Sequence, residues 1–307
     1  MAARAFALGT RGSKLALVQT DIVLRALRRQ HPDRTFSVKT IKTKGDQQSQ
    51  TPLEVLGRGV FSREIEQALL AKEIDIAVHS LKDLPGELPK GLTLGVVPER
   101  EDPRDVLLSK DGSSIGQLHA GAIVGTSSPR RTALIKELRP DVDAQNIRGN
   151  VDTRVRKLQD SEYDAVVLAA AGLERLGLTS HVTEYLDPDT FVPAVSQGVL
   201  GVECRQDDAG VIALLKPMEH GPTRIATMAE RAFLQAIGGG CKVPVAAYAT
   251  VQGDTVRVRG LIASPDGSRV YRQVLTAPSA KAEAAGRELV QQLRAAGAAD
   301  LLNQEAV

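Results

Sequence analysis

The chain is poor in the residue types on which several common classes of protein depend. Its 307 residues include two Cys, no Trp, four Tyr and five Phe. Two cysteines build neither a disulfide framework nor a zinc cluster, so we expect reduced thiols, no bound metal and a cytoplasmic location. So few aromatic rings also argue against a stacking platform for single-stranded nucleic acid.

Long apolar runs and a strong excess of one charge are also missing. The longest apolar stretch, at 165–173, has nine residues, whereas a membrane-spanning helix needs ~20. No apolar run typical of a signal peptide follows the first arginine. Lys plus Arg number 39 against 37 Asp plus Glu, and a net charge of +2 lacks the basic excess of a dedicated nucleic-acid binder. We therefore expect no membrane and no nucleic-acid partner.

Arginine supplies 26 of the 39 basic residues. Its planar guanidinium binds carboxylates and phosphates through two parallel hydrogen bonds. A GC-rich genome also raises the arginine content, and composition does not separate the two causes. The positions of the arginines along the chain are therefore needed to tell anion binding from a compositional bias.

Hydrophobic periodicity predicts three units of mixed secondary structure. Strands are predicted at 36–43, 75–79, 92–97, 122–125, 165–170, 199–202, 245–250 and 255–262. Helices are predicted at 62–72, 130–138, 226–237 and 281–296, with another from 152. Ser62 is a candidate N-cap for the first of these helices. The alternation of strand and helix before Pro217 predicts largely parallel sheets with helices on both faces, and the remainder is typical of an α+β unit with an antiparallel sheet.

Two predicted strands end in loops that suit an anion. The segment 7–14 leads into a helix through Thr10, Arg11, Gly12 and Ser13. The segment 125–131 does the same through Thr126, Ser127, Ser128, Pro129, Arg130 and Arg131. Small hydroxyl residues at a helix N-terminus leave backbone N–H groups available to an anion. One such loop alone is more simply an N-cap beside a solvated arginine, but two loops with arginine favour anion binding.

Later strands are also followed by arginine. Arg148 and Arg154 flank a turn and a helix start, and Arg175 follows the buried strand at 165–170. Taken alone, the segment 146–154 is more simply a solvated charged stretch. Ligands of parallel α/β sheets bind at the carboxyl ends of the strands, where most of these arginines fall. This placement predicts an arginine-lined cleft for a ligand with several carboxylates or phosphates.

Asp83 is a candidate for acid–base chemistry. It lies in the segment HSLKDLP after a predicted buried strand. A carboxylate among basic groups can transfer a proton or stabilise a developing cation. An equal alternative is that Asp83 pairs with Lys82 or caps the turn before Pro85. His79, in the same segment, is interpreted as a strand residue rather than a catalytic one.

Cys241 is a candidate nucleophile in the segment GGGCKVP. Three glycines allow a close backbone approach, and Lys242 can lower the pKa of the neighbouring thiol. The alternative is a small apolar residue in a loop. Cys204 lies in a strand context and is predicted to be structural.

Eight segments, in a fixed order, carry a resemblance to a known family: LGTRGSKLALVQT, GRGVFSREIE, DIAVHSLKDLP, GTSSPRRTA, NIRGNVDTRVRKL, AAAGLERLGL, VSQGVLGVECR and GGGCKVPVAAYA. Together they resemble the porphobilinogen deaminases, also called hydroxymethylbilane synthases, over essentially the whole chain. No single segment is specific to this family, but the ordered set is.

The resemblance implies an activity and the residues that perform it. The activity is a transferase reaction that joins four porphobilinogen molecules head to tail into hydroxymethylbilane, with loss of ammonia, in tetrapyrrole biosynthesis. The implied cofactor is dipyrromethane, bound through a thioether to Cys241. The implied catalytic residue is Asp83, which would stabilise the cation left by deamination. Each pyrrole carries an acetate and a propionate, and the implied binding residues are Arg11, Ser13, Lys82, Thr126, Ser127, Ser128, Arg130, Arg131, Arg148, Arg154, Arg175 and Gln197.

The resemblance also implies an α/β fold with three domains. Two domains similar to type II periplasmic binding proteins flank the active cleft, and a smaller α+β domain carries Cys241. The implied bounds are 1–98 with 199–217 for the first domain, 99–198 for the second and 218–307 for the third. A cytoplasmic monomer is expected.

The residues alone are also compatible with two other functions. A non-enzymatic anion-binding protein of the same two-lobed fold would need the arginines but neither Asp83 nor Cys241. The effector-sensing region of a transcription factor would need a DNA-binding module, and no helix-turn-helix precedes Leu8.

Overall fold

The computed structural model describes residues 5–47, 59–238 and 243–303. Contacts within the chain divide it into two compact units. Unit 1 comprises Met1–Arg100 and Val199–Arg224, and unit 2 comprises Glu101–Gly198 and Ile225–Val307. Unit 1 is therefore discontinuous in the sequence. The division into three domains stays a prediction beside these two units.

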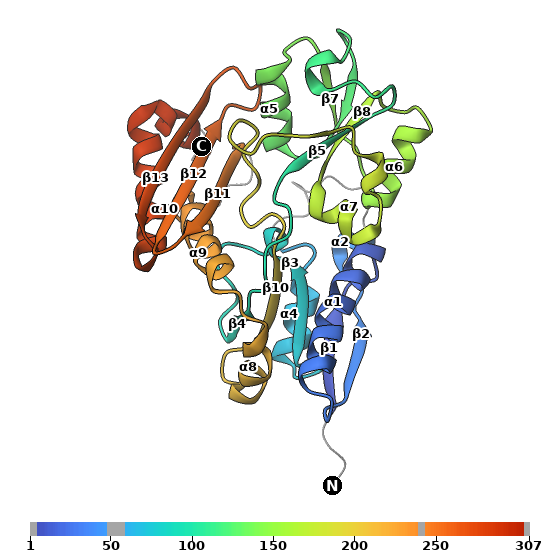
Figure 1. Cartoon of the computed structure of the whole chain (residues 1–307), viewed down its shortest axis with the longest axis vertical. Helices are drawn as coiled ribbons and strands as arrows, with labels where there is room; N and C mark the ends of the chain where they lie inside the picture. The colour runs from blue at the N-terminus through green and yellow to red at the C-terminus, as the bar shows by residue number, and fades with distance from the viewer. Residues whose placement is uncertain (1–4, 48–58, 239–242, 304–307) are drawn as a thin grey trace. The chain divides into compact units, whose positions relative to one another are not determined.

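Unit 1 is built on a five-stranded sheet in the order β2-β1-β3-β10-β4 (Figure 1). Its strands are β1 (Phe6–Thr10), β2 (Phe36–Thr40), β3 (Ile76–Ser80), β4 (Leu92–Val96) and β10 (Leu200–Arg205). Its helices are α1 (Lys14–Gln30), α2 (Lys44–Gln47), α4 (Arg63–Leu70), α8 (Ala209–Leu215) and the 3₁₀ helices η1 (Leu81–Asp83) and η4 (Lys216–Met218). β1 pairs parallel with β2 and β3, whereas β10 runs antiparallel to β3 and β4.

Helices cover both faces of this sheet because its strands are apolar on both sides. Ile76 and Val78 of β3 belong to one hydrophobic cluster with α1 and α8. Ala77, which alternates with them, packs instead in a cluster with Ile65 and Leu69 of α4. The prediction of a largely parallel sheet between helical layers is therefore confirmed for this unit.

The two predicted helix starts of unit 1 differ in how they are capped. Ser13 caps α1, because its hydroxyl oxygen accepts the Ala16 N–H at 3.3 Å. The prediction that Ser62 caps α4 is wrong, because its side chain makes no capping hydrogen bond. The Ser62 backbone adopts φ −117° and ψ −29°, outside the β-region geometry that directs an N-cap hydroxyl toward the free N–H groups.

Unit 2 contains a second five-stranded sheet, in the order β7-β6-β8-β5-β9, and a three-stranded sheet, in the order β11-β12-β13. The strands are β5 (Asp105–Ser109), β6 (Ile123–Gly125), β7 (Asp143–Gln145), β8 (Ala165–Ala169), β9 (Glu184–Tyr185), β11 (Val245–Gln252), β12 (Thr255–Ala263) and β13 (Val270–Pro278). The α-helices are α5 (Pro129–Leu138), α6 (Val151–Gln159), α7 (Ala170–Leu176), α10 (Ala282–Leu293), α11 (Ala299–Asn303) and α9 (Gly221–Ile237), most of which lies in this unit. Short helical turns are η2 (Ile115–Gln117), η3 (Thr179–His181), η5 (Ser279–Lys281) and the π-helical η6 (Arg294–Ala298).

Each five-stranded sheet has one strand that runs against the others. In unit 2 this strand is β5, which pairs antiparallel with β8 and β9. In unit 1 it is β10. Both strands stand next to a division of the chain, since β5 follows Arg100 and β10 follows Gly198. The periodicity of the sequence predicted neither β5 nor β7.

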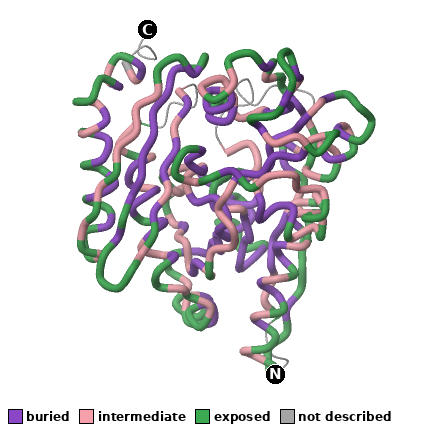
Figure 2. The backbone as a smooth tube through the Cα atoms, turned by 45° about the horizontal axis from the view of Figure 1, so that its top comes forward, coloured by how far each residue is buried: buried purple, intermediate pink, exposed green. Residues whose placement is uncertain are grey.

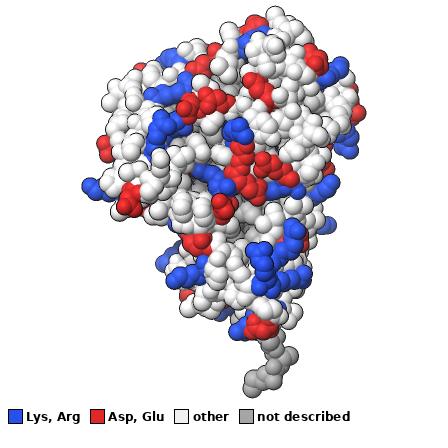
Figure 3. Space-filling model, in the orientation of Figure 1, with Lys and Arg blue, Asp and Glu red and all other residues white. Residues whose placement is uncertain are grey.

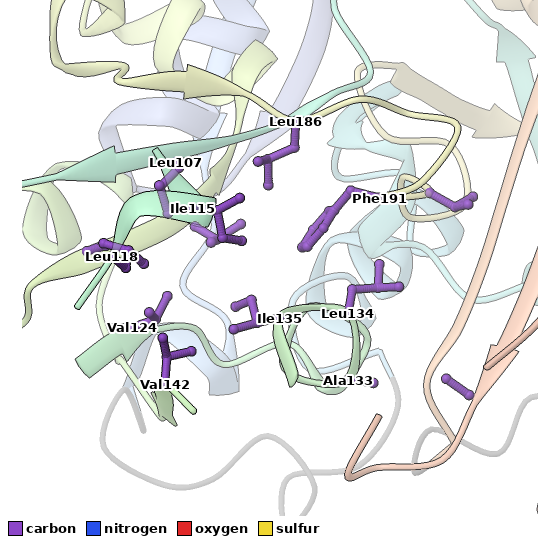
Figure 4. Packing of buried hydrophobic residues seen from close by; sticks show 14 of the residues in the cluster. Leu107, Ile115, Leu118, Val124, Ala133, Leu134, Ile135, Val142, Leu186 and Phe191 are labelled. Atoms are coloured by element: carbon purple, nitrogen blue, oxygen red, sulfur yellow. The ribbon is translucent and has the colours of Figure 1, made fainter. Parts of the chain in front are cut away.

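The three-stranded sheet shares its core with the second five-stranded sheet. Ala246 and Leu261 belong to the same hydrophobic cluster as Leu134 of α5 and Leu107 of β5. Figure 4 shows the α5 side chains and Leu107 within this cluster. Helices α9 and α10 pack on the three-stranded sheet through a second cluster, and burial alternates along α10 (Figure 2). The predicted α+β character with an antiparallel sheet is confirmed.

No helix in the described part of the chain has the length and apolar content needed to span a bilayer. Across the same residues, no three His, Cys, Asp or Glu side chains are grouped as metal ligands.

Gly286 allows α10 to approach α9 closely. A Cβ at this position would overlap the Ala229 carbonyl oxygen and lie 2.9 Å from the Phe233 backbone nitrogen. We expect Gly286→Ala to lower the free energy of unfolding by roughly 1–3 kcal/mol, although alanine favours helices by about 1 kcal/mol over glycine. Gly210→Ala in α8 is the control, because its Cβ would meet nothing closer than 3.5 Å. Urea titrations that show Gly286→Ala as stable as wild type would contradict the close contact.

Candidate active site

In unit 1, predicted site residues meet at the edge where β1 and β3 end and β10 begins. Arg11 and Ser13 follow β1, and Asp83 closes the 3₁₀ turn η1 after β3. These three side chains line one pocket, together with Leu15, Ala16, Gln19, Phe61, Ser62, Val78, His79 and Ser80. Lys82 is exposed and is not among the lining residues.

Arg11 is held in place by a carboxylate and a ring. Its Nε and Nη2 donate to the Asp46 carboxylate, with a shortest distance of 2.6 Å, and its guanidinium lies 4.1 Å from the centre of the Phe61 ring. Burial works against ionisation of Asp46, but hydrogen bonds from Arg11 and Thr43 and the charge of Arg11 lower the pKa of this carboxyl. The two donors used are on one side of the guanidinium, and no hydrogen bond joins Nη1 to another described residue.

Asp83 is exposed and forms no ion pair among the described residues. No ion pair joins Asp83 to Lys82 within the described residues, and a capping role before Pro85 stays a prediction. A carboxylate without a fixed cation can respond to a charge that a ligand brings into the pocket.

In unit 2, a buried carboxylate joins three of the predicted residues. Asp105, the first residue of β5, has no exposed surface. Its Oδ2 lies 2.7 Å from Arg130 Nη1, and its Oδ1 accepts from Arg131 Nη2 at 2.6 Å and from Gln197 Nε2 at 3.0 Å. Burial alone would raise the pKa of Asp105, but the charges of Arg130 and Arg131 outweigh it and hold this pKa well below its usual range.

Sequence reasoning missed Asp105, and its partners change the interpretation of the two arginines. Arg130 and Arg131 are buried, and each also donates to a backbone carbonyl, Val192 O at 2.8 Å and Val167 O at 2.9 Å. Much of their binding capacity is therefore used inside the protein. The available signal was the apolar run that Asp105 opens, which marks the residue as the start of a buried strand.

Arg154 of α6 is the cation at this edge that lacks an acidic partner. Burial and the charges of Arg131 and Arg148 lower its pKa to about 10. Its Nε donates to Gly149 O at 2.9 Å, and no described carboxylate pairs with it. Bringing positive charges together at a partly buried place costs free energy that a bound anion offsets.

The hydroxyl residues before α5 are partly used for local structure. Ser128 is the N-cap of α5 and its oxygen accepts the Arg131 N–H at 3.4 Å, while Pro129 occupies the first turn. Ser127 Oγ donates to Ile147 O at 2.8 Å. Thr126 is buried and its oxygen accepts the Ser128 N–H at 3.2 Å.

Arg175 does not join this arginine group. Its Nε lies 2.8 Å from Glu101 and its Nη2 donates to Gly198 O at 3.1 Å. Burial lowers the pKa of Arg175, and Glu101 and Glu174 act in the opposite direction. Arg11, Arg130, Arg131 and Arg175 thus all have carboxylate partners in the protein, and acidic and basic side chains are interspersed on the face drawn in Figure 3.

Of the two cysteines, Cys204 lies within the described residues. Cys241, the predicted cofactor attachment residue, lies outside the described residues. Cys204 is buried in β10, and burial together with Asp208 and Glu203 raises the pKa of its thiol to about 11. Because the thiolate is the reactive form, Cys204 is unsuited to act as a nucleophile.

Each unit thus places arginine and hydroxyl side chains at the ends of its strands. Residues 6–213 match the family model described as "Porphobilinogen deaminase, dipyromethane cofactor binding domain", and residues 225–295 match "Porphobilinogen deaminase, C-terminal domain". The chain belongs to the porphobilinogen deaminase family, which uses a dipyrromethane cofactor. The predicted family and cofactor are confirmed.

Curated relatives named porphobilinogen deaminase match nearly the whole chain. The Brevibacillus brevis protein is 48% identical over 296 residues, covering 96% of this chain and 95% of its own length. The Bacillus subtilis protein is 45% identical over 304 residues, covering 98% and 96%. The Roseiflexus sp. protein is 52% identical over 264 residues, covering 86% and 87%.

Solved structures that match the chain include binding proteins. The probable amino-acid transporter extracellular-binding protein YtmK of Bacillus subtilis has a TM-score of 0.44 at 12% identity, covering 70% of this chain and 90% of its own. The periplasmic binding protein STM4351 of Salmonella typhimurium, described as specific for arginine, has a TM-score of 0.42 at 14% identity, covering 70% and 92%. The α/β class itself rests on the strand orders of the two five-stranded sheets.

Asp105 is expected to be essential for folding of unit 2. Asp105→Asn leaves two buried guanidinium groups without their counter-charge, and we expect a loss of roughly 3–5 kcal/mol in the free energy of unfolding. Asp46→Asn is the matched control, with an expected loss of about 0–1 kcal/mol because its ion pair is partly exposed. Equal losses in urea titrations of the two variants would contradict the assignment.

The depressed pKa of Asp105 also predicts a pH dependence. Its stabilising contribution is complete above the unfolded value of about 3.9 and is lost as the pH falls below this value toward the lower folded pKa. Wild-type protein should therefore lose more free energy of unfolding between pH 5 and pH 3 than Asp105→Asn does. Parallel stability curves for the two proteins would contradict this.

Proposed function

We propose that this chain deaminates porphobilinogen and joins four molecules of it head to tail into hydroxymethylbilane, with Asp83 as the catalytic carboxylate. One observation carries the assignment of Asp83: this unpaired carboxylate lines the same pocket as Arg11 and Ser13. A cation and a hydroxyl beside it suit a substrate that presents both carboxylates and an amine. Family membership supports the activity.

Asp83 is proposed to act on the charge that deamination creates. When the C–N bond of the aminomethyl group breaks with its nitrogen protonated, the nitrogen leaves with the electron pair as ammonia and the pyrrole is left cationic. A carboxylate positioned beside that cation stabilises it. After the new C–C bond forms, the same carboxylate can accept the proton lost from the pyrrole carbon.

The residues present fit a dipyrromethane cofactor. Its acetate and propionate groups need cationic partners, and Arg154 is a partly buried cation that no described carboxylate neutralises. We propose that Arg148, Arg154 and the Thr126 hydroxyl bind these carboxylates, and that a thioether joins the cofactor to Cys241. When bound, the cofactor supplies the pyrrole to which the first substrate molecule is joined.

The rest of the predicted binding set belongs to the same proposal. Arg11 binds substrate carboxylate through its remaining nitrogen, while Arg130, Arg131 and Gln197 hold the loop that carries the hydroxyl groups. Ser13, Lys82, Ser127, Ser128 and Arg175 complete the proposed set. A cytoplasmic location, a monomeric state and the absence of nucleic-acid and membrane partners are part of the proposal.

Attachment of the cofactor predicts a measurable mass. Intact mass spectrometry of the purified protein should give the polypeptide mass plus one dipyrromethane unit, and Cys241→Ser should lose this addition. Cys204→Ala is the control and should keep it, because the second cysteine is buried. A fully active wild-type protein with the bare polypeptide mass would refute the thioether.

Asp83→Asn tests the catalytic carboxylate. We expect kcat to fall by roughly 10²- to 10⁴-fold, with the cofactor mass retained, because the change removes the charge and keeps the shape. Glu87→Gln, an exposed carboxylate beyond η1, is the control and should keep its turnover. Near-normal turnover of Asp83→Asn would show that another group performs this step.

A further inference from the structure

Unit 1 contains a buried group of ionisable side chains that the proposed function does not use. His79 of β3 and Glu203 of β10 are almost fully buried, with side chains 5% and 0% exposed, and His79 Nε2 lies 3.2 Å from Glu203 Oε2. Glu66 of α4, also buried, interacts electrostatically with both. These three residues are called the Glu66–His79–Glu203 cluster.

The strand register brings this cluster together. Glu203 pairs with Ala77, and Gly201 pairs with His79, so Glu203 and His79 are diagonal neighbours on one face of the sheet. An irregularity in the β10–β4 pairing lies between Val202 and Glu203, and such bulges redirect side chains. The face is the one covered by α4, which adds Glu66.

The cluster is poorly satisfied as a structural element. Glu66 Oε1, His79 Nε2 and both carboxylate oxygens of Glu203 are buried and have no hydrogen-bond partner among the described residues. Buried ion pairs stabilise a fold only when their remaining polar atoms are hydrogen-bonded. In unit 2, Asp105 Oδ1 is hydrogen-bonded although Oδ2 is not, whereas neither carboxylate oxygen of Glu203 is hydrogen-bonded within the described residues.

The cluster also reaches the active pocket. His79 is one of the pocket's lining residues, and the lining also includes Arg11, which follows β1, and Asp83 from η1. Helix α4 adds Arg63 beside Glu66, and α1 adds the uncharged Gln19, which donates to Ser80 at 2.7 Å. Among the lining residues, His79 is thus the link between the buried acids and Asp83.

Burial sets the charge state of the cluster. Burial and the charge of Glu203 raise the pKa of Glu66, and the Ser62 hydroxyl and His79 offset this only in part. Burial thus favours the neutral form of Glu66.

We propose that the Glu66–His79–Glu203 cluster is the second acid–base group of the pocket, with His79 holding a proton against Glu203 and exchanging it with the site where Asp83 lies. This inference rests on the proposed function. In each addition, His79 gives its proton to the departing amine, so that the C–N bond breaks and ammonia leaves with the bonding pair. The cluster regains a proton when the pyrrole carbon loses its own on formation of the C–C bond. One amine and one pyrrole C–H thus become one C–C bond and one ammonia.

The first test is the pH dependence of kcat in four variants. His79→Gln should lower kcat on the order of 10²-fold, with little change in KM, and should remove one limb of the pH profile. Glu203→Gln should move that limb to lower pH, because the imidazolium loses its counter-charge. Glu66→Gln should move that limb less than Glu203→Gln does, because burial already favours the neutral form of Glu66. His31→Gln is the matched control, because its ring bonds to Leu214 O away from the pocket lining.

The second test does not need turnover. The chain has five histidines, so ¹⁵N NMR of the labelled wild-type protein can assign His79 by its loss in His79→Gln. We expect imidazolium shifts for His79 at pH 7 and neutral imidazole shifts in Glu203→Gln. A neutral His79 between pH 6 and 8, or both limbs retained in a folded His79→Gln, would overturn the proposal. Wild-type protein that makes no hydroxymethylbilane would refute the proposed function, and the NMR comparison would still decide the state of the cluster.

Discussion

The compensation of buried guanidinium groups by carboxylates is the interaction on which both units depend. In unit 2, the Asp105 carboxylate at the start of β5 holds Arg130 and Arg131 of α5 and Gln197 of the segment before β10. Breaking such a pair leaves an isolated buried charge, which costs far more than the pair contributes when intact. The strand, the helix and the loop of this edge are thus fixed by one carboxylate.

Unit 1 uses the same device at the opposite edge of its sheet. Arg205, at the end of β10, donates to Asp75 at 2.9 Å and to the carbonyls of Leu69 and Ile74. Asp75 also accepts the Ala7 N–H at 3.0 Å. The structural ion pair of unit 1 therefore lies away from the edge that carries Asp83, whereas that of unit 2 lies within the predicted binding edge. At the pocket edge of unit 1, Arg11 pairs with the partly exposed Asp46, whereas Asp83 forms no ion pair among the described residues.

Local patterns predicted the elements well and the ion pairs poorly, for a physical reason. Strands such as β3 and β8 follow from apolar runs, and the loops around Arg11 and Ser128 follow from small hydroxyl residues at helix starts, all within about ten residues. The partners of Asp105 lie 26 and 92 residues away, and His79 meets Glu203 only through the β3–β10 register. Chain topology decides these contacts. The contacts of Asp105 depend on β5, and β5 was not predicted from the sequence.

These pairings also explain how a chain with a net charge of +2 can provide an anion site. Arg11, Arg130, Arg131 and Arg175 each lie against a carboxylate of the protein, so their number overstates the charge offered to a ligand. At the unit 2 edge, Arg154 has no carboxylate partner among the described residues, and the charges of Arg131 and Arg148 act on it. The paired arginines are held in place by protein carboxylates, so their N–H groups have fixed directions. Their charges are already balanced, so they add little to the repulsion between positive charges that a bound carboxylate has to offset. In the proposed function, holding the loops and attracting the ligand therefore fall to different arginines, a difference that arginine content alone does not reveal.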